Sequence, residues 1–287
     1  MIKKSLLSAK TKDRLFRIFA IGCTGFALLT LAVLLIDITI KGATRLNWSF
    51  FTSLPSRFPE QSGIYTALAG MVSLLIFTLI VALPIGILAG IYLQEYGKKN
   101  RLAKFVEINI SNLAGVPSVI YGILGLQVFV RMMHLGNSIL AGSLTLSLLI
   151  MPIIIVSTRE AVKAVPDSLR QAAYGLGATK WQTIRRVVLP SSFGGIMTGI
   201  ILSTSRAIGE TAPLIVVGAL AYVPFIPEGP LDQYTSLPIQ IFNWTSRPQQ
   251  GFVTNAAAGI IVLLLFTFIL NGFAIYLRNK WYKKTSQ

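Results

Sequence analysis

The stretch IYTALAGMVSLLIFTLIVALPIGILAGIYL, residues 64–93, runs for 30 residues without Asp, Glu, Lys or Arg. A hydrocarbon core about 30 Å thick is crossed by roughly 20 apolar residues of α-helix. The stretch therefore predicts a membrane-spanning helix that is long enough to tilt, and Pro84 supplies a cause for a kink. Backbone in lipid must satisfy its own hydrogen bonds, so a bundle of such helices is the expected fold class.

Five further apolar windows predict an all-α integral membrane protein with six transmembrane helices. Only 13% of the 287 residues are charged, about half the fraction usual in a soluble domain. We expect a basic N-terminal tail (1–17), one transmembrane domain (18–277) and a basic C-terminal tail (278–287). The predicted spans cover residues 18–36, 64–93, 112–130, 138–156, 190–217 and 254–277.

The net charge of +16 is distributed unevenly along the chain. With the N-terminus inside, the inner segments hold 20 Lys and Arg residues, the outer segments hold 5, and Arg206 lies within the fifth span. Such asymmetry is typical of cytoplasmic loops, so both termini are expected in the cytoplasm. Basic residues beside anionic lipid headgroups account for the charge without nucleic acid. The first apolar run is too long for a cleaved signal peptide, so an uncleaved span is expected.

Two connecting segments are too long to be simple turns. The external loop (218–253) is rich in proline and aromatic residues, which favours contact with headgroups, a cap over the pathway or a surface for an external partner. The cytoplasmic loop (158–189) carries a helix–glycine–helix pattern. A helix start is predicted at Asp167 or Ser168, and Gly175 or Gly177 can end that helix. By itself the pattern is also compatible with a surface hairpin that has no partner.

The same segment resembles the Glu-Ala-Ala loop of ABC importer permeases, EAA-x3-G-x9-I-x-LP. The residues that match its spacing are Gln171, Ala172, Ala173, Gly177, Val187, Leu189 and Pro190. Gln171 replaces the family's Glu, which keeps hydrogen-bonding capacity but removes the charge that a salt bridge would need. The resemblance implies a type I ABC importer permease bundle whose cytoplasmic coupling helix docks on a separate ATP-hydrolysing subunit.

No G-x-x-x-x-G-K-[ST] phosphate loop occurs in the chain, so the nucleotide chemistry is expected in a partner subunit. The single cysteine, Cys23, allows no disulfide within the chain and is expected to be a small packing residue. We therefore expect a transporter permease rather than an enzyme, with no cofactor, no metal and no catalytic residue. The pairs Gly86/Gly90 and Gly195/Gly199 predict close approach of the second and fifth spans to neighbours, although glycine is common in membrane helices.

Arg206 and Glu210 are the charges inside the fifth span, and their separation of four residues places them on one helix face. Hydroxyl side chains flank them at Ser203, Thr204, Ser205 and Thr211. A guanidinium with hydroxyl donors suits an oxyanion that has shed its water, so these residues are candidates for the substrate pathway. A structural ion pair is the alternative. Arg206 lies about 24 Å along the helix from Pro190, which predicts a position beyond the midplane, toward the outside.

Residues 205–213 (SRAIGETAP) resemble the helix-five signature of phosphate-specific ABC permeases, and residues 113–122 and 89–96 are similar to other parts of that family. Ser118 and Tyr121, in the second of these stretches, are weaker candidates for the pathway. The resemblance covers about residues 60–277 and is stronger to the A-type than to the C-type subunit. It implies alternating-access import of inorganic phosphate across a prokaryotic cell membrane.

The implied partners are a C-type permease subunit, two copies of a cytoplasmic ATP-binding subunit and an extracytoplasmic phosphate-binding protein. A permease for molybdate or sulfate would share the coupling loop, so only the segment around Arg206 favours phosphate. A channel or secondary transporter would need no coupling loop and would commonly show an inverted repeat, which the sequence lacks. A membrane enzyme would need a nucleophile–base set or a metal cluster, and neither is evident in the spans.

Overall fold

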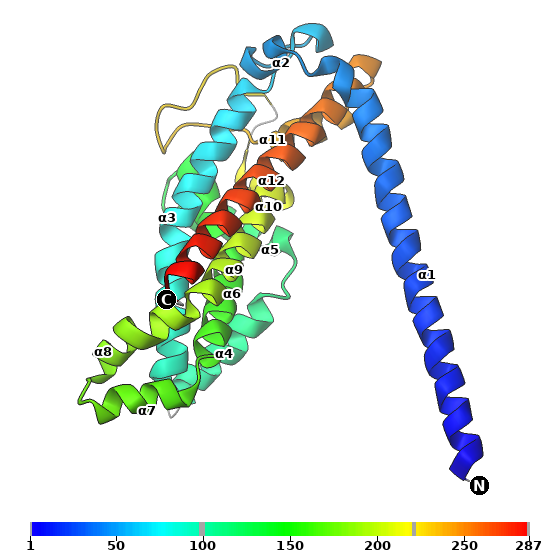
Figure 1. Ribbon diagram of the computed structural model, residues 1–287. Helices are drawn as coiled ribbons and strands as arrows, with labels where there is room; N and C mark the ends of the chain where they lie inside the picture. The colour runs from blue at the N-terminus through cyan, green and yellow to red at the C-terminus, as the bar shows by residue number, and fades with distance from the viewer. Residues whose placement is uncertain (1, 98–100, 220–221, 286–287) are drawn as a thin grey trace.

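The computed structural model describes residues 2–97, 101–219 and 222–285, which form a helical bundle without strands (Figure 1). The helices are α1 (Ile2–Gly42), η1 (Ala43–Arg45), α2 (Trp48–Thr52), η2 (Pro59–Gln61), α3 (Tyr65–Glu95), α4 (Arg101–Leu113), α5 (Ser118–Gly125), η4 (Leu126–Met132), α6 (Ile139–Lys163), α7 (Asp167–Gly175), α8 (Lys180–Thr183), η5 (Ile184–Val188), α9 (Leu189–Gly209), α10 (Ala212–Val217), α11 (Leu237–Thr245) and α12 (Gln250–Thr285). Of these, η4 and η5 are π-helical and continue the helices before them.

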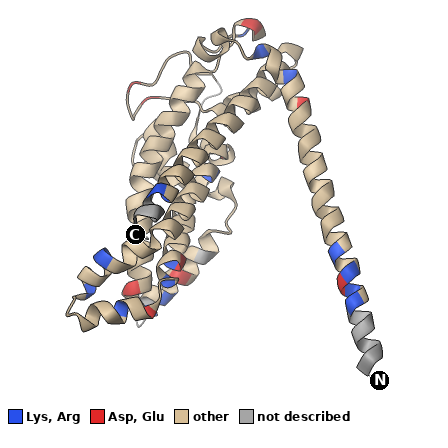
Figure 2. Cartoon of the chain, in the orientation of Figure 1, with Lys and Arg blue, Asp and Glu red and all other residues tan. Residues whose placement is uncertain are grey.

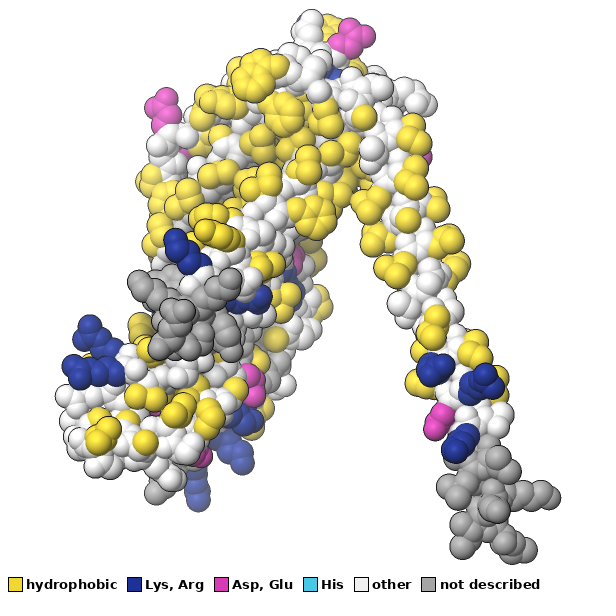
Figure 3. Space-filling view, viewed as in Figure 1, with side chains coloured by type: hydrophobic (Ala, Val, Ile, Leu, Met, Phe, Trp, Pro, Cys, Tyr) yellow, Lys and Arg dark blue, Asp and Glu magenta, His cyan; other side chains and the backbone are white. Residues whose placement is uncertain are grey.

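The bundle has two distinct ends (Figure 1). One end carries the hairpin of α7 and α8, and most Lys and Arg residues gather toward it, so we call it the basic end (Figure 2). The opposite end carries α2 and α11, and we call it the distal end. Hydrophobic side chains cover the visible flank between the two ends, including α1 (Figure 3). This distribution fits a protein that crosses a membrane from one end to the other.

Helix α6 lies at the centre of the bundle, with α3 and α9 packed against it. A side-chain carbon added at Gly86 of α3 would lie 2.7 Å from Ile154 Cγ2, and one at Gly199 of α9 would lie 2.3 Å from Ser157 Cβ. These distances are shorter than van der Waals contact, so a larger residue at either position would force its neighbour on α6 to move. Both predicted glycine pairs therefore mark close approaches to α6.

The six predicted spans are an approximate count. Among the described residues, five helices are long and apolar enough to cross a membrane, and residues 118–132 form a sixth, shorter apolar helix. The prediction of one continuous span over 112–130 is wrong, because α4 ends at Leu113 and the chain is not helical again until Ser118. Pro117 has no N–H to donate to a preceding turn, which accounts for the interruption.

The fifth predicted span is also interrupted. Helix α9 ends at Gly209, Glu210 is extended with ψ of 124°, and α10 begins at Ala212. At the other end, the helix begins well before Pro190, because α8 and η5 run into α9 and form one apolar helix from Lys180. Glu210 therefore follows the helix that carries Arg206 and is not part of it.

Helix α1 stands apart from the rest of the bundle (Figure 1). It begins at Ile2, so the predicted N-terminal tail continues the first span as helix, and α12 likewise extends through the predicted C-terminal tail to Thr285. Helix α1 contacts the bundle near its distal end, where Gly42 lies against Ala257 and Ala258. Cys23 is exposed, so within this chain it is not a packing residue.

The predicted external loop contains a buried helix. Tyr234 and Trp244 are fully buried around α11, whereas Tyr222 and Phe225 are exposed. Residues 234–241 are all buried, and a carbon added at Gly70 of α3 would lie 2.2 Å from the carbonyl oxygen of Thr235. The expectation of aromatic contact with headgroups therefore suits Tyr222, Phe225 and Phe242, whereas residues 234–241 form part of the core.

Candidate functional site

Arg206 and Glu210 form an ion pair where α9 ends. Arg206 Nε lies 3.0 Å from Glu210 Oε1, with 38% of the Arg206 side chain and 15% of the Glu210 side chain exposed. Arg206 shares the exposed face of α9 with Leu202, one turn earlier. Because the helix ends between the two residues, the carboxylate reaches back to the guanidinium from extended backbone.

The pair lies near mid-height of the bundle. Arg278 of α12 follows the apolar part of that helix and donates from Nη1 to Thr198 Oγ1 at 3.1 Å. Arg206 is eight residues beyond Thr198, so it lies about 12 Å closer to the distal end. A hydrocarbon core is about 30 Å thick, so a rise of about 12 Å from its basic-end boundary is close to its middle. The position predicted from the sequence is nearer the outside because it is counted from Pro190, which lies about 12 Å on the other side of Thr198.

The flanking hydroxyls are not gathered around the guanidinium. Ser203 is fully buried and donates to the carbonyl of Ile200 at 3.0 Å. Ser205 donates to Asn271 Oδ1 of α12 at 2.7 Å, which ties α9 to that helix. Thr211 lies in the interruption between α9 and α10. Of the five predicted pathway residues, the structure brings Arg206 and Glu210 together, and it gives Ser203 and Ser205 other partners.

The two interrupted helices meet beside this pair. Tyr121 of α5 lies within electrostatic reach of Arg206 and donates to the carbonyl of Leu113, across the break between α4 and α5, at 2.8 Å. Gly122 packs against Pro213 of α10, where an added carbon would lie 2.8 Å from its Cα. Non-helical backbone at membrane depth is tolerated where it is buried in protein or lines a polar cavity. Tyr121, a weaker candidate from the sequence, is thus on the same side of the bundle as Arg206 and interacts with it electrostatically.

The second candidate site is the hairpin of α7 and α8. Helix α7 begins at Asp167, Gly177 adopts the left-handed conformation with φ of +80°, and Thr179 caps α8. The cap is reciprocal: Gln182 N donates to Thr179 Oγ1 at 3.3 Å, and Thr179 N donates to Gln182 Oε1 at 2.8 Å. The predicted turn chemistry is confirmed, and the start of α7 lies within one residue of the prediction.

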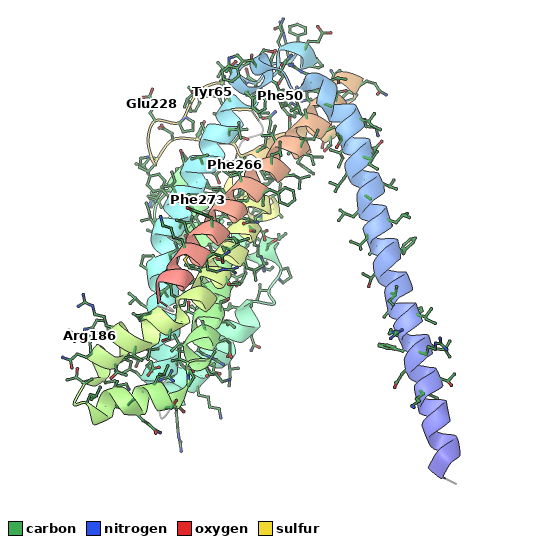
Figure 4. All side chains as sticks on the ribbon, in the orientation of Figure 1. Phe50, Tyr65, Arg186, Glu228, Phe266 and Phe273 are labelled. Carbon is green, nitrogen blue, oxygen red and sulfur yellow. The ribbon has the colours of Figure 1, made fainter. Side chains whose placement is uncertain are left out.

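The hairpin exposes large apolar side chains. Leu176 is 90% exposed and Trp181 is 58% exposed at its tip. Gln171 and Ala172 are exposed as well, whereas Ala173 is buried and Leu189 packs against an apolar cluster at the start of α9. A groove of about 340 Å³ runs between the two helices past Gly177. Arg186 projects from the same side (Figure 4). Exposed apolar side chains around a groove are typical of a docking surface for a protein partner.

The family described as binding-protein-dependent transport system inner membrane components matches residues 82–281. The chain belongs to this family. It is 33% identical over 264 residues to the phosphate transport system permease protein PstA of Yersinia pestis, covering 91% of this chain and 88% of that protein. It is 29% identical over 297 residues to the probable ABC transporter permease protein YqgI of Bacillus subtilis, covering 97% and 99%.

A solved structure supports the same fold for this permease. A chain of a bacterial alginate ABC transporter in complex with an alginate pentasaccharide-bound periplasmic protein superposes with a TM-score of 0.69, covering 94% of this chain and 96% of that chain, at 15% identity. The fold is that of a type I ABC importer permease. The permease is a multi-span inner membrane component, and ATP hydrolysis belongs to a separate subunit.

Two residues that anchor the permease's hairpin were not predicted as site residues. Arg170 of α7 forms an ion pair with Glu95 at the end of α3, with Nη2 to Oε1 at 3.0 Å. Both side chains are more than nine-tenths buried. A signal for Glu95 was present in the sequence, because it is the first charge after the charge-free stretch 64–93. Its partner, 75 residues away, could not be identified without the fold.

Proposed function

We propose that this chain is the A-type permease subunit of an ATP-driven importer that moves inorganic phosphate into the cytoplasm by alternating access. The observation that carries the proposal is the Arg206 guanidinium, partly exposed near mid-height and held by Glu210. Its planar set of donors matches the oxygens of phosphate, and Glu210 orients it while limiting how tightly an anion is held. Relatives named as phosphate transport system permeases support the same substrate class.

The exposed face around Arg206 also supports a second permease subunit. A charge at the bilayer centre costs at least about 2.5–3.5 kcal/mol when it faces lipid. A C-type subunit that covers this face would enclose the pair in a pathway, and the exposed apolar surface of α1 offers further area for such a heterodimer. Two copies of an ATP-binding subunit would then dock on the hairpins of the two permeases, and a phosphate-binding protein would dock at the distal end.

The proposed orientation places the basic end in the cytoplasm. The excess of Lys and Arg at this end follows the rule for cytoplasmic segments, which supports a location of both termini inside a prokaryotic cell. The hairpin then faces the compartment that contains ATP.

Phosphate uptake tests the proposal directly. Vesicles that contain this chain with its co-expressed partners should accumulate radiolabelled phosphate when ATP is supplied on the cytoplasmic side, and should not do so without ATP. Because the guanidinium fits other tetrahedral oxyanions, sulfate and molybdate are included as competitors. ATP-driven uptake of sulfate or molybdate with no uptake of phosphate would identify that oxyanion as the substrate. Uptake without ATP would contradict the importer mechanism.

A further inference from the structure

Two cations from the two helices of the hairpin hold one residue at the end of α3. Arg170 of α7 donates to Glu95 Oε1 from Nε at 3.3 Å and from Nη2 at 3.0 Å. Lys180 of α8 donates to the main-chain carbonyl of Glu95 at 2.6 Å. The Lys180 ammonium also lies 4.0 Å from the ring centroid of Tyr96, the next residue. The hairpin therefore contacts the side chain and the carbonyl of Glu95 and the ring of Tyr96.

The Arg170 side chain connects three elements. Besides Glu95, it donates to the carbonyls of Val162 at 2.8 Å and Val165 at 2.5 Å, and to Asp167 Oδ1 at 3.1 Å. With 9% of the Arg170 side chain and 8% of the Glu95 side chain exposed, little water competes for these contacts. A buried ion pair with satisfied partners has one well-defined geometry, which makes it suitable for transmitting a displacement.

The chain path makes this contact informative. Backbone joins the hairpin to α6 on one side and, through η5, to α9 on the other. No backbone joins it to α3, which ends about 70 residues earlier in the sequence. Helix α3 extends 31 residues to the distal end, where Gly70 packs against Thr235 beside the buried helix α11.

We propose that Glu95 is a positioning residue that couples hairpin movement to α3, so that docking of the ATPase moves three helices of the pore and not only α6 and α9. This inference rests on the coupling role proposed above for the hairpin. It assigns to α3 the transmission of that movement toward the distal end.

The test is the amount of phosphate transported per ATP hydrolysed by the purified, reconstituted complex. Glu95→Gln keeps an acceptor for Arg170 but removes the charge, and Arg170 retains Asp167. We expect ATP hydrolysis to continue while transport per ATP falls about five-fold or more, the lower end of the range for coupling between sites. An apolar cluster that includes Ile91 and Val188 still packs α3 against the hairpin's base, which favours an assembled variant.

Lys180→Met provides a second variant that removes the other contact with Glu95 at an exposed position, and it decides the question if Glu95→Gln does not assemble. The matched control is Glu107→Gln. Glu107 of α4 pairs with Arg159 of α6 at 2.5 Å, and Arg159 retains Glu160 at 2.9 Å when Glu107 is changed. This control should leave transport per ATP unchanged.

A purely structural role for Glu95 would lower the amount of complex, and with it hydrolysis and transport together. An unchanged ratio in assembled Glu95→Gln or Lys180→Met complex therefore overturns the proposal, as does an equal fall of the ratio in the control. The assignment of phosphate is tested separately. If the unaltered complex carries another oxyanion, the ratio is measured with that anion, and the role of Glu95 is judged on the same criterion.

Discussion

At the level of single residues, Arg206 and Glu210 depend on each other because both lie where the bundle is interrupted. Glu210 is only 15% exposed, so removal of Arg206 alone leaves a carboxylate with little water around it. A loss of function in a single variant is therefore ambiguous. It could report the loss of an anion site or the cost of stranding a charge.

The double variant Arg206→Gln/Glu210→Gln separates these explanations, since it strands neither charge. A hydrogen bond to a charged group contributes about 1.5–3 kcal/mol, so we expect assembled complex whose phosphate uptake at low concentration is roughly 10- to 100-fold lower. Complex yield and initial uptake rate are the two measurements. Near-normal uptake by assembled double variant would mean that the pair is structural.

Sequence reasoning identified this ion pair but not its surroundings. The spacing of four residues and the cost of charge in lipid were enough to associate Arg206 with Glu210. The hydrogen-bond partners of the flanking hydroxyls were not predictable in this way, because they depend on which helix packs against α9. Asn271, which accepts from Ser205, follows it by 66 residues. The starting point of the helix was also not predictable, because the helix begins at Lys180 and nothing at Pro190 marks its start.

At the level of secondary-structure elements, the turn between α7 and α8 depends on one backbone conformation. Gly177 has φ of +80°, which a β-branched residue adopts only with strain of about 1–2 kcal/mol. We expect Gly177→Val to distort the groove between the two helices and to lower ATPase-subunit binding and ATP-driven uptake, while membrane insertion is unaffected. Co-purification of the ATPase subunit and vesicle uptake measure the effect.

Gly175→Val is the matched control for this change. A carbon added at either glycine meets nothing within 4 Å, and of the two only Gly177 has positive φ. If the Gly175→Val complex retains the ATPase subunit, the defect of Gly177→Val is caused by its backbone conformation and not by the volume of the valine side chain. Full transport by Gly177→Val would remove the coupling assignment.

A second element-level prediction concerns the contact between α3 and α6, which is joined by hydroxyl groups. Ser143 donates to the Leu74 carbonyl at 3.1 Å, and the Ser147 hydroxyl lies 3.1 Å from the Thr78 carbonyl as well as 2.7 Å from the Ser143 carbonyl of its own helix. Interhelical hydrogen bonds in membranes contribute about 0.6 kcal/mol on average. Ser143→Ala/Ser147→Ala should therefore lower the thermal stability of the purified complex modestly. Ser157→Ala, whose hydroxyl bonds within α6 at 2.7 Å, should not, and equal shifts would argue against the interhelical bonds.

Long charge-free stretches predicted the helices well, and interruptions were predicted poorly. Hydropathy reports whether a segment resides in lipid, and it does not report whether the backbone stays helical there. Pro84 lies inside a continuous α3, whereas Pro117 precedes the first residue of α5. Proline thus lies inside one helix and at an interruption of another, so the residue type alone does not predict where a helix is broken.

At the level of the whole molecule, the arrangement of α1 is informative because it leaves the bundle incomplete. Its apolar residues from Leu15 to Ile36 are exposed, and it packs against α12 near the distal end, where Gly42 meets Ala257 and Ala258. Together with the exposed face around Arg206, this surface fits a chain that folds beside another membrane subunit. The two features lie on different elements, so a partner that covers both would have to extend across much of the bundle.

The last prediction is the orientation of the whole molecule in the membrane. In a Cys23→Ala background, Gln233→Cys at the distal end should react with an impermeant maleimide on intact cells, because the basic end is expected inside. Asn279→Cys, exposed near the end of α12, should react only after permeabilisation. Gln287 would serve for the same purpose but lies outside the described residues. Gln233 and Asn279 are both exposed, so the side of the membrane on which each lies, and not its burial, decides whether it is labelled. Reaction of Asn279→Cys on intact cells, with Gln233→Cys protected, would invert the topology and place the hairpin away from the ATP that it is proposed to couple.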